Sequence, residues 1–137
     1  MFWGAALESD QEMAKSRQTQ HAYNASCAAA LAGSGVTRPT VPPECVHNAH
    51  MYYVLLPRQL PRGEVLSELN RRNVNAVFHY VPLHSAPAGR RFGRVATSMA
   101  VTDDVSDRLI RLPLWVGMEP QVPAQVVGEL AALTAHV

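Results

Sequence analysis

Residues 49–56 read AHMYYVLL, and this stretch decides how the neighbouring segments are interpreted. Its aromatic and β-branched side chains are typical of a strand, and Pro57 closes it. Residues 74–80 (VNAVFHY) have the same character and predict a second strand. Between them, residues 61–72 begin with a proline suited to a first helical turn and carry apolar side chains at helical spacing. The centre of the chain is therefore predicted to fold as strand, helix, strand.

On the N-terminal side, residues 2–32 contain no proline and no glycine after Gly4. Their apolar residues recur at roughly helical spacing, which predicts one long helix or two helices in tandem. A Gly-Ser-Gly sequence at 33–35 ends this helical segment, and the proline-rich residues 36–46 form an extended connector.

On the C-terminal side, residues 81–92 contain proline and glycine and are predicted to be a loop. A short helix, capped at residues 102–104 or 106, should run through Ile110. Residues 112–115 (LPLW) predict a short strand whose proline favours an edge position. Residues 123–135 predict a closing amphipathic helix.

This order predicts an α+β fold, in which a long N-terminal helix precedes a small antiparallel or mixed sheet with helices packed on one face. We expect two parts: residues 1–35 as the long helix and residues 36–137 as a small α+β domain.

Composition excludes several classes of protein. The 137 residues carry a net charge of +1, with 47% hydrophobic and 17% charged residues, so the chain is globular and has no electrostatic footprint for nucleic acid or an anionic membrane. No apolar run approaches the roughly 18 residues of a membrane span, and the N-terminus does not resemble a signal peptide. Cys27 and Cys45 are too few for a disulfide framework. These features predict a cytoplasmic location.

A metal site is one hypothesis that the sequence raises. Cys45, His47 and His50 lie within six residues, and sulfur with imidazole would suit zinc. Their spacing matches no standard zinc finger, and no second pair of ligands follows. Ordinary residues at the entry to a strand, with no metal, are the favoured interpretation.

The segment HYVPLH, residues 79–84, is the most informative motif. It lies where a strand gives way to a loop, a common position for side chains that contact ligands. His79, Tyr80 and His84 can donate hydrogen bonds to phosphate or sugar hydroxyl groups, although residues at the end of a strand are more often structural. The following Arg90, with Arg91 and Arg94, could bind phosphate or carboxylate or could simply be solvated.

Three segments together carry a family resemblance. Residues 45–53 (CVHNAHMYY), 76–93 (AVFHYVPLHSAPAGRRFG) and 106–114 (SDRLIRLPL) resemble, in order and spacing, the C-terminal small domain of the DegT/StrS-type sugar aminotransferases. Residues 2–10 more weakly resemble the long helix with which that family leaves its large domain.

The resemblance implies a type I pyridoxal-phosphate fold in which the missing large domain binds the cofactor and supplies the lysine of the Schiff base. Lys15 is the only lysine here and matches no cofactor motif. Arginine cannot replace it, because the guanidinium stays protonated. We therefore expect the C-terminal portion of a nucleotide-sugar aminotransferase that is inactive alone, with no catalytic residue and no bound cofactor in this chain.

For the full-length parent, the resemblance implies transfer of the amino group of glutamate to C4 of dTDP-4-keto-6-deoxyglucose, giving dTDP-4-amino-4,6-dideoxygalactose. It implies that the small domain lines the substrate side of the cleft and helps to form a homo-oligomer. The expected substrate-binding residues are His79, Tyr80, His84, Asn48, His50 and Arg90.

Two consequences remain open. The alternative function is a non-enzymatic binding or dimerisation module derived from the small domain. Without a large domain, the apolar side chains of the first helix would lose burial worth roughly 1.5–3 kcal/mol each, which predicts self-association or fraying of that helix. The side chains concerned are Phe2, Trp3, Leu7 and Met13.

Overall fold

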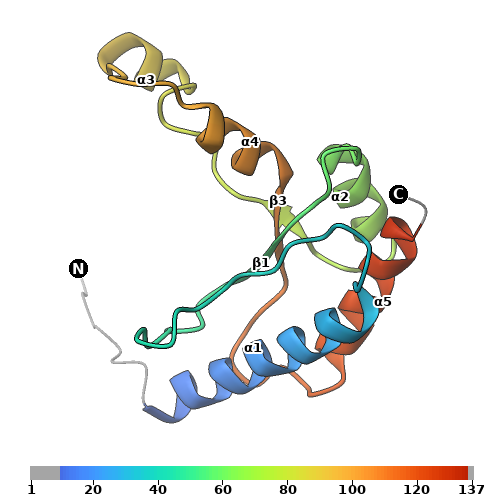
Figure 1. The fold of residues 1–137 in the computed structure, drawn as a ribbon. Coiled ribbons are helices and arrows are strands. Elements are labelled where there is room, and N and C mark those ends of the chain that lie inside the picture. Colours follow the sequence, from blue (N-terminus) through green and yellow to red (C-terminus); the bar gives the residue numbers. More distant parts are fainter. Residues whose placement is uncertain (1–9, 136–137) are drawn as a thin grey trace.

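The computed structural model describes residues 10–135, which form five helices and three strands. Figure 1 shows helices gathered around a small sheet and an arm that projects away from it. The arm comprises residues 81–108, which include the helices at 87–92 and 100–108. In chain order the elements are α1 (Asp10–Ala30), β1 (Tyr52–Leu55), α2 (Arg62–Arg71), β2 (Val77–Phe78), α3 (Pro87–Phe92), α4 (Ala100–Arg108), β3 (Leu109–Leu112) and α5 (Val122–Thr134).

The sheet has the strand order β1-β3-β2, with β3 antiparallel to both neighbours. The predicted α+β fold with an antiparallel sheet is confirmed. The prediction of an edge strand at residues 112–115 is wrong, because β3 begins at Leu109 and is the central strand. Pro113 follows the last paired residue and so interrupts no hydrogen bond within the sheet.

One face of the sheet carries the hydrophobic core. Strand residues alternate between faces, and the buried positions of β1 and β3 all point the same way. Apolar side chains of α1, α2 and α5 cover them. Members of this cluster include Tyr52, Val54, Ile110 and Leu112 from the strands, Tyr23 and Cys27 of α1 with Leu31 just after it, Val65 and Leu69 of α2, and Val126, Val127 and Leu130 of α5.

Two buried tyrosines attach α1 to the sheet. The rings of Tyr23 and Tyr52 stack with their centroids 4.7 Å apart. The Tyr23 hydroxyl donates to the carbonyl oxygen of Pro113 at 2.6 Å, and the Tyr52 hydroxyl donates to Oδ1 of Asn24 at 2.8 Å. The phenol groups thus keep their polar atoms paired while their rings fill the core.

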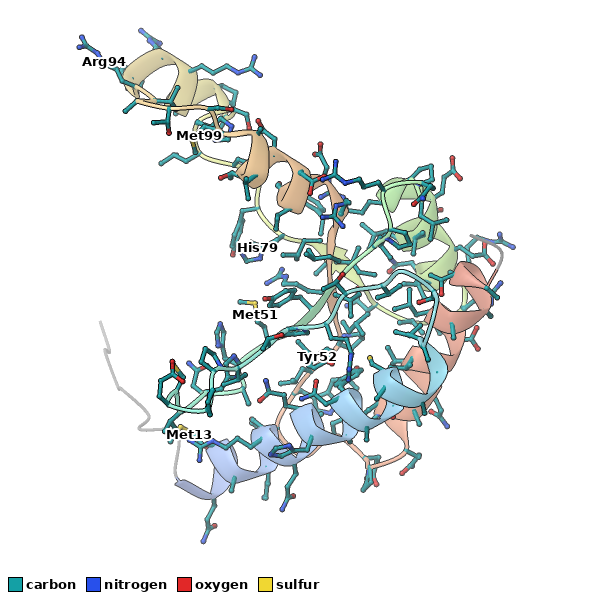
Figure 2. All side chains as sticks on the ribbon, viewed as in Figure 1. Met13, Met51, Tyr52, His79, Arg94 and Met99 are labelled. Atoms are coloured by element: carbon teal, nitrogen blue, oxygen red, sulfur yellow. The ribbon has the colours of Figure 1, made fainter. Side chains whose placement is uncertain are left out.

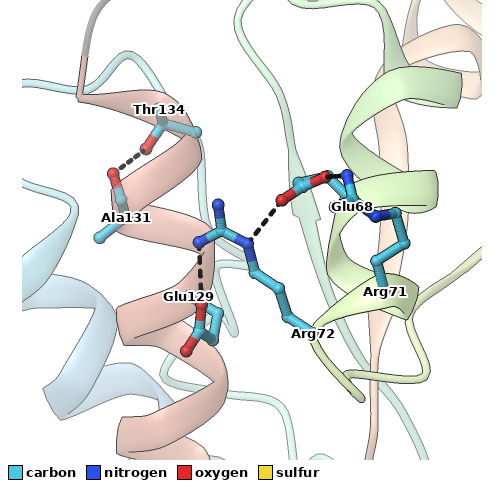
Figure 3. Close-up of polar contacts among 6 residues, drawn as sticks. All are labelled: Glu68, Arg71, Arg72, Glu129, Ala131 and Thr134. Atoms are coloured by element: carbon cyan, nitrogen blue, oxygen red, sulfur yellow. Dashed lines mark hydrogen bonds and ion pairs between the residues drawn. The ribbon is translucent and has the colours of Figure 1, made fainter.

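Ion pairs link α2 to α5 on the outside of this core (Figure 3). Glu68 accepts from Arg71 at 2.6 Å and from Arg72 at 2.8 Å, and Arg72 also contacts Glu129 of α5 at 3.0 Å. The hydrogen bond from Arg72, followed by the nearby positive charges, lowers the pKa of the Glu68 carboxyl. These exposed pairs orient the two helices but contribute little stability.

The helical predictions at 61–72 and 123–135 are confirmed, and so is the long first helix over the residues described. Phe2, Trp3 and Leu7 lie outside the described residues, and Met13 is half-buried. The connector at 36–46 is extended, and Thr37 pairs with Leu55 through two hydrogen bonds of 2.9 Å.

Three other predictions need correction. The first strand starts at Tyr52 and not at Ala49, because Ala49 has a left-handed φ of 52° that extended pairing does not allow. The second strand pairs only at Val77 and Phe78, since β3 is itself short. Residues 81–92 are not all loop, because Pro87 begins the helix α3.

Among residues 10–135, no helix combines the length and the apolar character that a membrane crossing requires.

Candidate functional site

Among residues 10–135, the helices that contribute to the hydrophobic core all pack against one face of the sheet, and we call the opposite face the open face. Tyr53 of β1, Arg111 of β3 and Val77 of β2 align in register on this open face. Strand alternation carries the same face on to His79, just after β2. Figure 2 shows His79 on this side of the sheet, whereas Tyr52 points toward α1.

His79 and Tyr80 lie where the open face meets the base of the arm. Their rings make an edge-on contact with centroids 4.9 Å apart. Both line a hollow of about 450 Å³ whose other walls include Val101 and Val105 of α4 and Leu109. Nδ1 of His79 is covered and has no hydrogen-bond partner among the described residues, while Tyr80 is 75% exposed.

His84 and Arg90 line a second hollow, of about 550 Å³, within the arm. Nε2 of His84 lies 2.8 Å from Oδ1 of Asp103 in α4, which joins the two sides of the arm. Thr102 of α4 lines both this hollow and the one beside His79 and Tyr80. The two hollows therefore adjoin each other along α4, and the HYVPLH segment lines both.

The close packing of the arm depends on Gly89. A Cβ atom there would lie 1.6 Å from the carbonyl oxygen of Leu83 and 2.7 Å from its carbonyl carbon. Only glycine allows α3 to approach the HYVPLH segment so closely.

Asp104 of α4 forms ion pairs with Arg108 at 2.7 Å and with Arg58 at 3.0 Å. The hydrogen bond that Arg108 donates is the main cause that lowers the pKa of the Asp104 carboxyl.

Asn48 and His50 lie apart from both hollows of the arm. Nδ1 of His50 lies 2.6 Å from Oδ1 of Asn48. His50 also lines a smaller hollow of about 170 Å³, whose walls include Asn75, Val77 and Arg111. The six predicted residues are therefore distributed over three neighbouring places and do not form one tight cluster.

The metal hypothesis finds no support in the part of the chain from residue 10 to 135. That part holds no group of three or more His, Cys, Asp or Glu residues arranged to bind a metal ion. Nδ1 of His47 accepts the backbone N–H of Ala49 at 2.9 Å, and Nδ1 of His50 is engaged by Asn48. These contacts fit residues that shape the entry to β1.

Arg111 is the residue that the motif search missed. Its guanidinium carbon lies 5.9 Å from the centre of the Tyr80 ring, and it also lines the hollow beside His50. It thus connects two of the three places just described. The sequence does carry a signal for it, since an arginine between Ile110 and Leu112 in a strand must face away from the core that those two residues enter.

Within residues 10–135, the surroundings of Lys15 do not fit pyridoxal phosphate. Lys15 lies on the exposed side of α1, beside a hollow lined by Gln18, Thr19, Glu119 and Pro123. None of the residues lining this hollow offers an aromatic ring to stack on the cofactor, and no glycine-rich turn precedes a helix there to hold its phosphate. Lys15 is therefore a surface residue in this structure.

The family to which these features belong is shown by comparison with known proteins. Residues 4–131 match the model of the DegT/DnrJ/EryC1/StrS aminotransferase family. The chain belongs to this family. The expected family resemblance is thereby confirmed, whereas the particular sugar transaminase is not identified by it.

Solved structures place the fold within the same group of enzymes. The crystal structure of DesV from S. venezuelae, in complex with a ketimine intermediate, is 21% identical with a TM-score of 0.75, and the match covers 90% of this chain and 33% of DesV. The aminotransferase PseC of Helicobacter pylori, involved in the biosynthesis of pseudoaminic acid, is 15% identical with a TM-score of 0.80, covering 96% of this chain and 35% of PseC.

A curated relative, the uncharacterised protein MJ1066 of Methanocaldococcus jannaschii, is 26% identical over 106 residues, which is 74% of this chain and 28% of that protein. The chain thus spans about a third of the length of the DegT/DnrJ/EryC1/StrS proteins it matches. At these identities the solved structures establish the fold that this third of the molecule adopts.

Proposed function

We propose that this chain is the C-terminal portion of a cytoplasmic, pyridoxal-phosphate-dependent nucleotide-sugar aminotransferase. The observation that carries the proposal is the continuous family match over residues 4–131. By its resemblance, the parent reaction takes an amino group from glutamate and delivers it to C4 of dTDP-4-keto-6-deoxyglucose. The product would be that of a dTDP-4-amino-4,6-dideoxygalactose transaminase.

In this proposal the chain contributes substrate contacts and not the chemical step. His79 and Tyr80 line one hollow beside α4, and His84 and Arg90 line the adjoining one. Imidazole, phenol and guanidinium groups are suitable donors for sugar hydroxyls and phosphate oxygens. Asn48 and His50 would extend this surface toward the far end of the sheet. When bound in the parent, the cofactor supplies the electron sink for transamination.

The same reasoning predicts that residues 1–137 alone do not transaminate. Lys15 lies on α1, whereas the HYVPLH segment lies at the base of the arm on the other side of the sheet (Figure 1). The purified chain, incubated with pyridoxal phosphate and then freed of unbound cofactor, should show no aldimine absorbance. With pyridoxal phosphate, glutamate and the keto sugar it should form no more amino-sugar product than a mixture without protein. Turnover by this chain would overturn the prediction.

A complementation experiment tests the proposed parent function. A lysine-bearing large domain of a family member would be expressed with and without this chain. We expect amino-sugar formation only when both are present, and only with the cofactor lysine intact.

The alternative, a binding or dimerisation module, has a different outcome in the same experiment. Such a module would associate with a full-length relative without restoring transamination. The DNA upstream of Met1 provides an independent test, since an adjoining large-domain sequence with the cofactor lysine supports the aminotransferase portion and its absence supports the module. We also propose that the working form is a homo-oligomer, supported by the apolar surface of the arm discussed below.

A further inference from the structure

Arg111 differs from the other arginines in being partly buried while having no hydrogen-bond or ion-pair partner among residues 10–135. Most of the described arginines donate hydrogen bonds or form ion pairs; for example, Arg108 donates to the Leu56 carbonyl at 2.9 Å and to Asp104 at 2.7 Å. Arg90, Arg91 and Arg94 have no such partner among residues 10–135, but they are exposed on the arm. Arg111 lies in the middle of the sheet, and its Nε is buried without a hydrogen-bond partner among residues 10–135. Nε of Arg108 is also buried without a partner, but the other two nitrogens of the Arg108 guanidinium are paired, whereas no hydrogen bond or ion pair is found for Arg111 in that part of the chain.

The surroundings of Arg111 hold it in place without neutralising it. Its guanidinium rests near the Tyr80 ring, 5.9 Å from the centre, a contact that leaves the N–H groups at its edge unused. Val77 and Tyr53 flank it in the sheet register. No carboxylate lines the adjoining hollow, whose polar residues are His50, Asn75 and Arg111 itself.

The chemistry of this hollow favours a small anion. A guanidinium presents parallel donors that match the two oxygens of a carboxylate or phosphate. Asn75 can add an amide donor. Nδ1 of His50 donates to Oδ1 of Asn48, so Nε2 of His50 can donate to an anion only when the imidazole is protonated. A hollow of about 170 Å³ has room for one such group but not for a nucleotide.

We propose that Arg111, with Asn75 and His50, forms a binding site for a carboxylate or phosphate group on the open face of the sheet. The site is distinct from the hollows around α4 and does not depend on transaminase activity. A buried N–H donor without a partner is unfavourable, and a bound oxyanion would accept hydrogen bonds from the Arg111 guanidinium and so remove that free-energy cost. The juxtaposition of β3, the residues after α2 and the entry to β1 creates the site.

Titrations followed by NMR test the proposal directly. The Nε–Hε signals of the arginines would be recorded while inorganic phosphate is added in one series and glutarate, a simple dicarboxylate, in another, at constant ionic strength. We expect a saturable shift of the Arg111 signal, with a dissociation constant on the order of 1–10 mM for a partly open charge-assisted site. The series that saturates identifies the phosphate or the carboxylate as the preferred group.

Arg91 provides a matched control, because its guanidinium also rests on an aromatic ring, 5.0 Å from the centre of Phe92, but borders none of the three hollows. Arg111→Gln should weaken binding by roughly tenfold or more, and Arg91→Gln should leave it unchanged. Arg111→Lys keeps the positive charge but loses the paired donors of the guanidinium. Its affinity for the anion should therefore lie between those of the wild type and Arg111→Gln.

Three results would overturn the proposal: no saturable shift with either anion, the same shift with added chloride, or equal weakening by Arg91→Gln. The wild-type titration decides the question even if a substitution at Arg111 disturbs folding. Because none of these measurements uses turnover, their failure is distinguishable from failure of the proposed aminotransferase function.

Discussion

At the scale of single residues, the hydroxyl group of Tyr52 is a strong determinant of how α1 sits on the sheet. Tyr52 is fully buried and donates to Asn24 at 2.8 Å. Tyr52→Phe keeps the stacked ring but removes that bond, so the free energy of unfolding should fall by about 1 kcal/mol. Urea denaturation measures this change.

Tyr53→Phe is the control for this substitution. Tyr53 occupies the next position of the same strand on the open face, and no hydrogen bond of its hydroxyl is found among residues 10–135. Tyr53→Phe should therefore leave the free energy of unfolding within ~0.5 kcal/mol of the wild type. Equal effects of the two substitutions would contradict the role given to the Asn24 bond.

The buried thiol of Cys27 predicts a dependence of stability on pH. Burial is the main cause that raises the pKa of Cys27 in the folded chain. In the unfolded chain the thiol ionises near its ordinary pKa of about 8.5, so above that pH the unfolded state binds fewer protons than the folded state. The free energy of unfolding should therefore fall as pH rises from there toward the raised folded pKa.

Denaturation midpoints measured from neutral to alkaline pH check this sign. In Cys27→Ala the free energy of unfolding should fall less steeply with rising pH. Cys45→Ala, at an exposed position, should leave this pH dependence unchanged. Some decline should persist in Cys27→Ala at the alkaline end, because burial also raises the pKa of Tyr23 and Tyr52. Rising stability over this range would show that the thiolate is accommodated in the core.

At the scale of elements, the arm formed by α3 and α4 depends on the contact between Gly89 and Leu83. Gly89→Ala would place a methyl group 1.6 Å from the Leu83 carbonyl oxygen, so α3 must move away. Overpacking of this kind costs about 1–3 kcal/mol. We expect faster hydrogen exchange in α3 and at His84, with α5 unaffected because the arm does not share its core.

Gly128→Ala in α5 is a matched control for the arm. A Cβ at Gly128 meets nothing within 4 Å, and alanine is the better helix former by about 0.5–1 kcal/mol. This control should slightly stabilise the chain and leave exchange in the arm unchanged. If Gly89→Ala also leaves exchange in α3 unchanged, the close approach is not what holds the arm together.

At the scale of the whole molecule, the arm concentrates exposed apolar surface. Figure 1 shows it extending away from the core, and Figure 2 places Arg94 at its tip and Met99 where the chain returns. Five large apolar side chains of this region are more than half exposed: Val81, Leu83, Phe92, Val95 and Val101. Surface of this kind favours association with another copy or another domain.

Self-association is therefore the expected behaviour of the isolated chain. Sedimentation velocity should show an average mass that rises with concentration. Phe92→Gln should weaken association by roughly tenfold to a hundredfold, as expected for loss of one buried aromatic contact worth ~1.5–3 kcal/mol. Val46→Gln should have no effect, because Val46 is 85% exposed but lies in the connector before β1. A monomer at every concentration would contradict the expectation.

Local sequence was sufficient to predict three of the helices and the position of the HYVPLH segment. Helical spacing identified α2 and α5, each of which buries an apolar stripe, and α1, which buries Tyr23 and Cys27 on a face that also buries Ser16, Thr19 and Gln20. The position of HYVPLH after a strand was also predictable, because His79 directly follows β2. The order of the strands was not predictable, since strands of two to four residues acquire their partners only through tertiary contacts. Pro113 predicts an edge strand, whereas β3 ends one residue before it and is central.

The sequence by itself determined the type of most elements, the α+β class and the family resemblance, because all three depend on residue types and spacings along the chain. Only the tertiary structure decided that β3 is central and that His84 meets Asp103 across the arm. It also decided that Arg111 faces the same hollow as His50. The physical reason is that sheet register and packing join residues far apart in sequence, and no local pattern encodes which of these distant residues will meet.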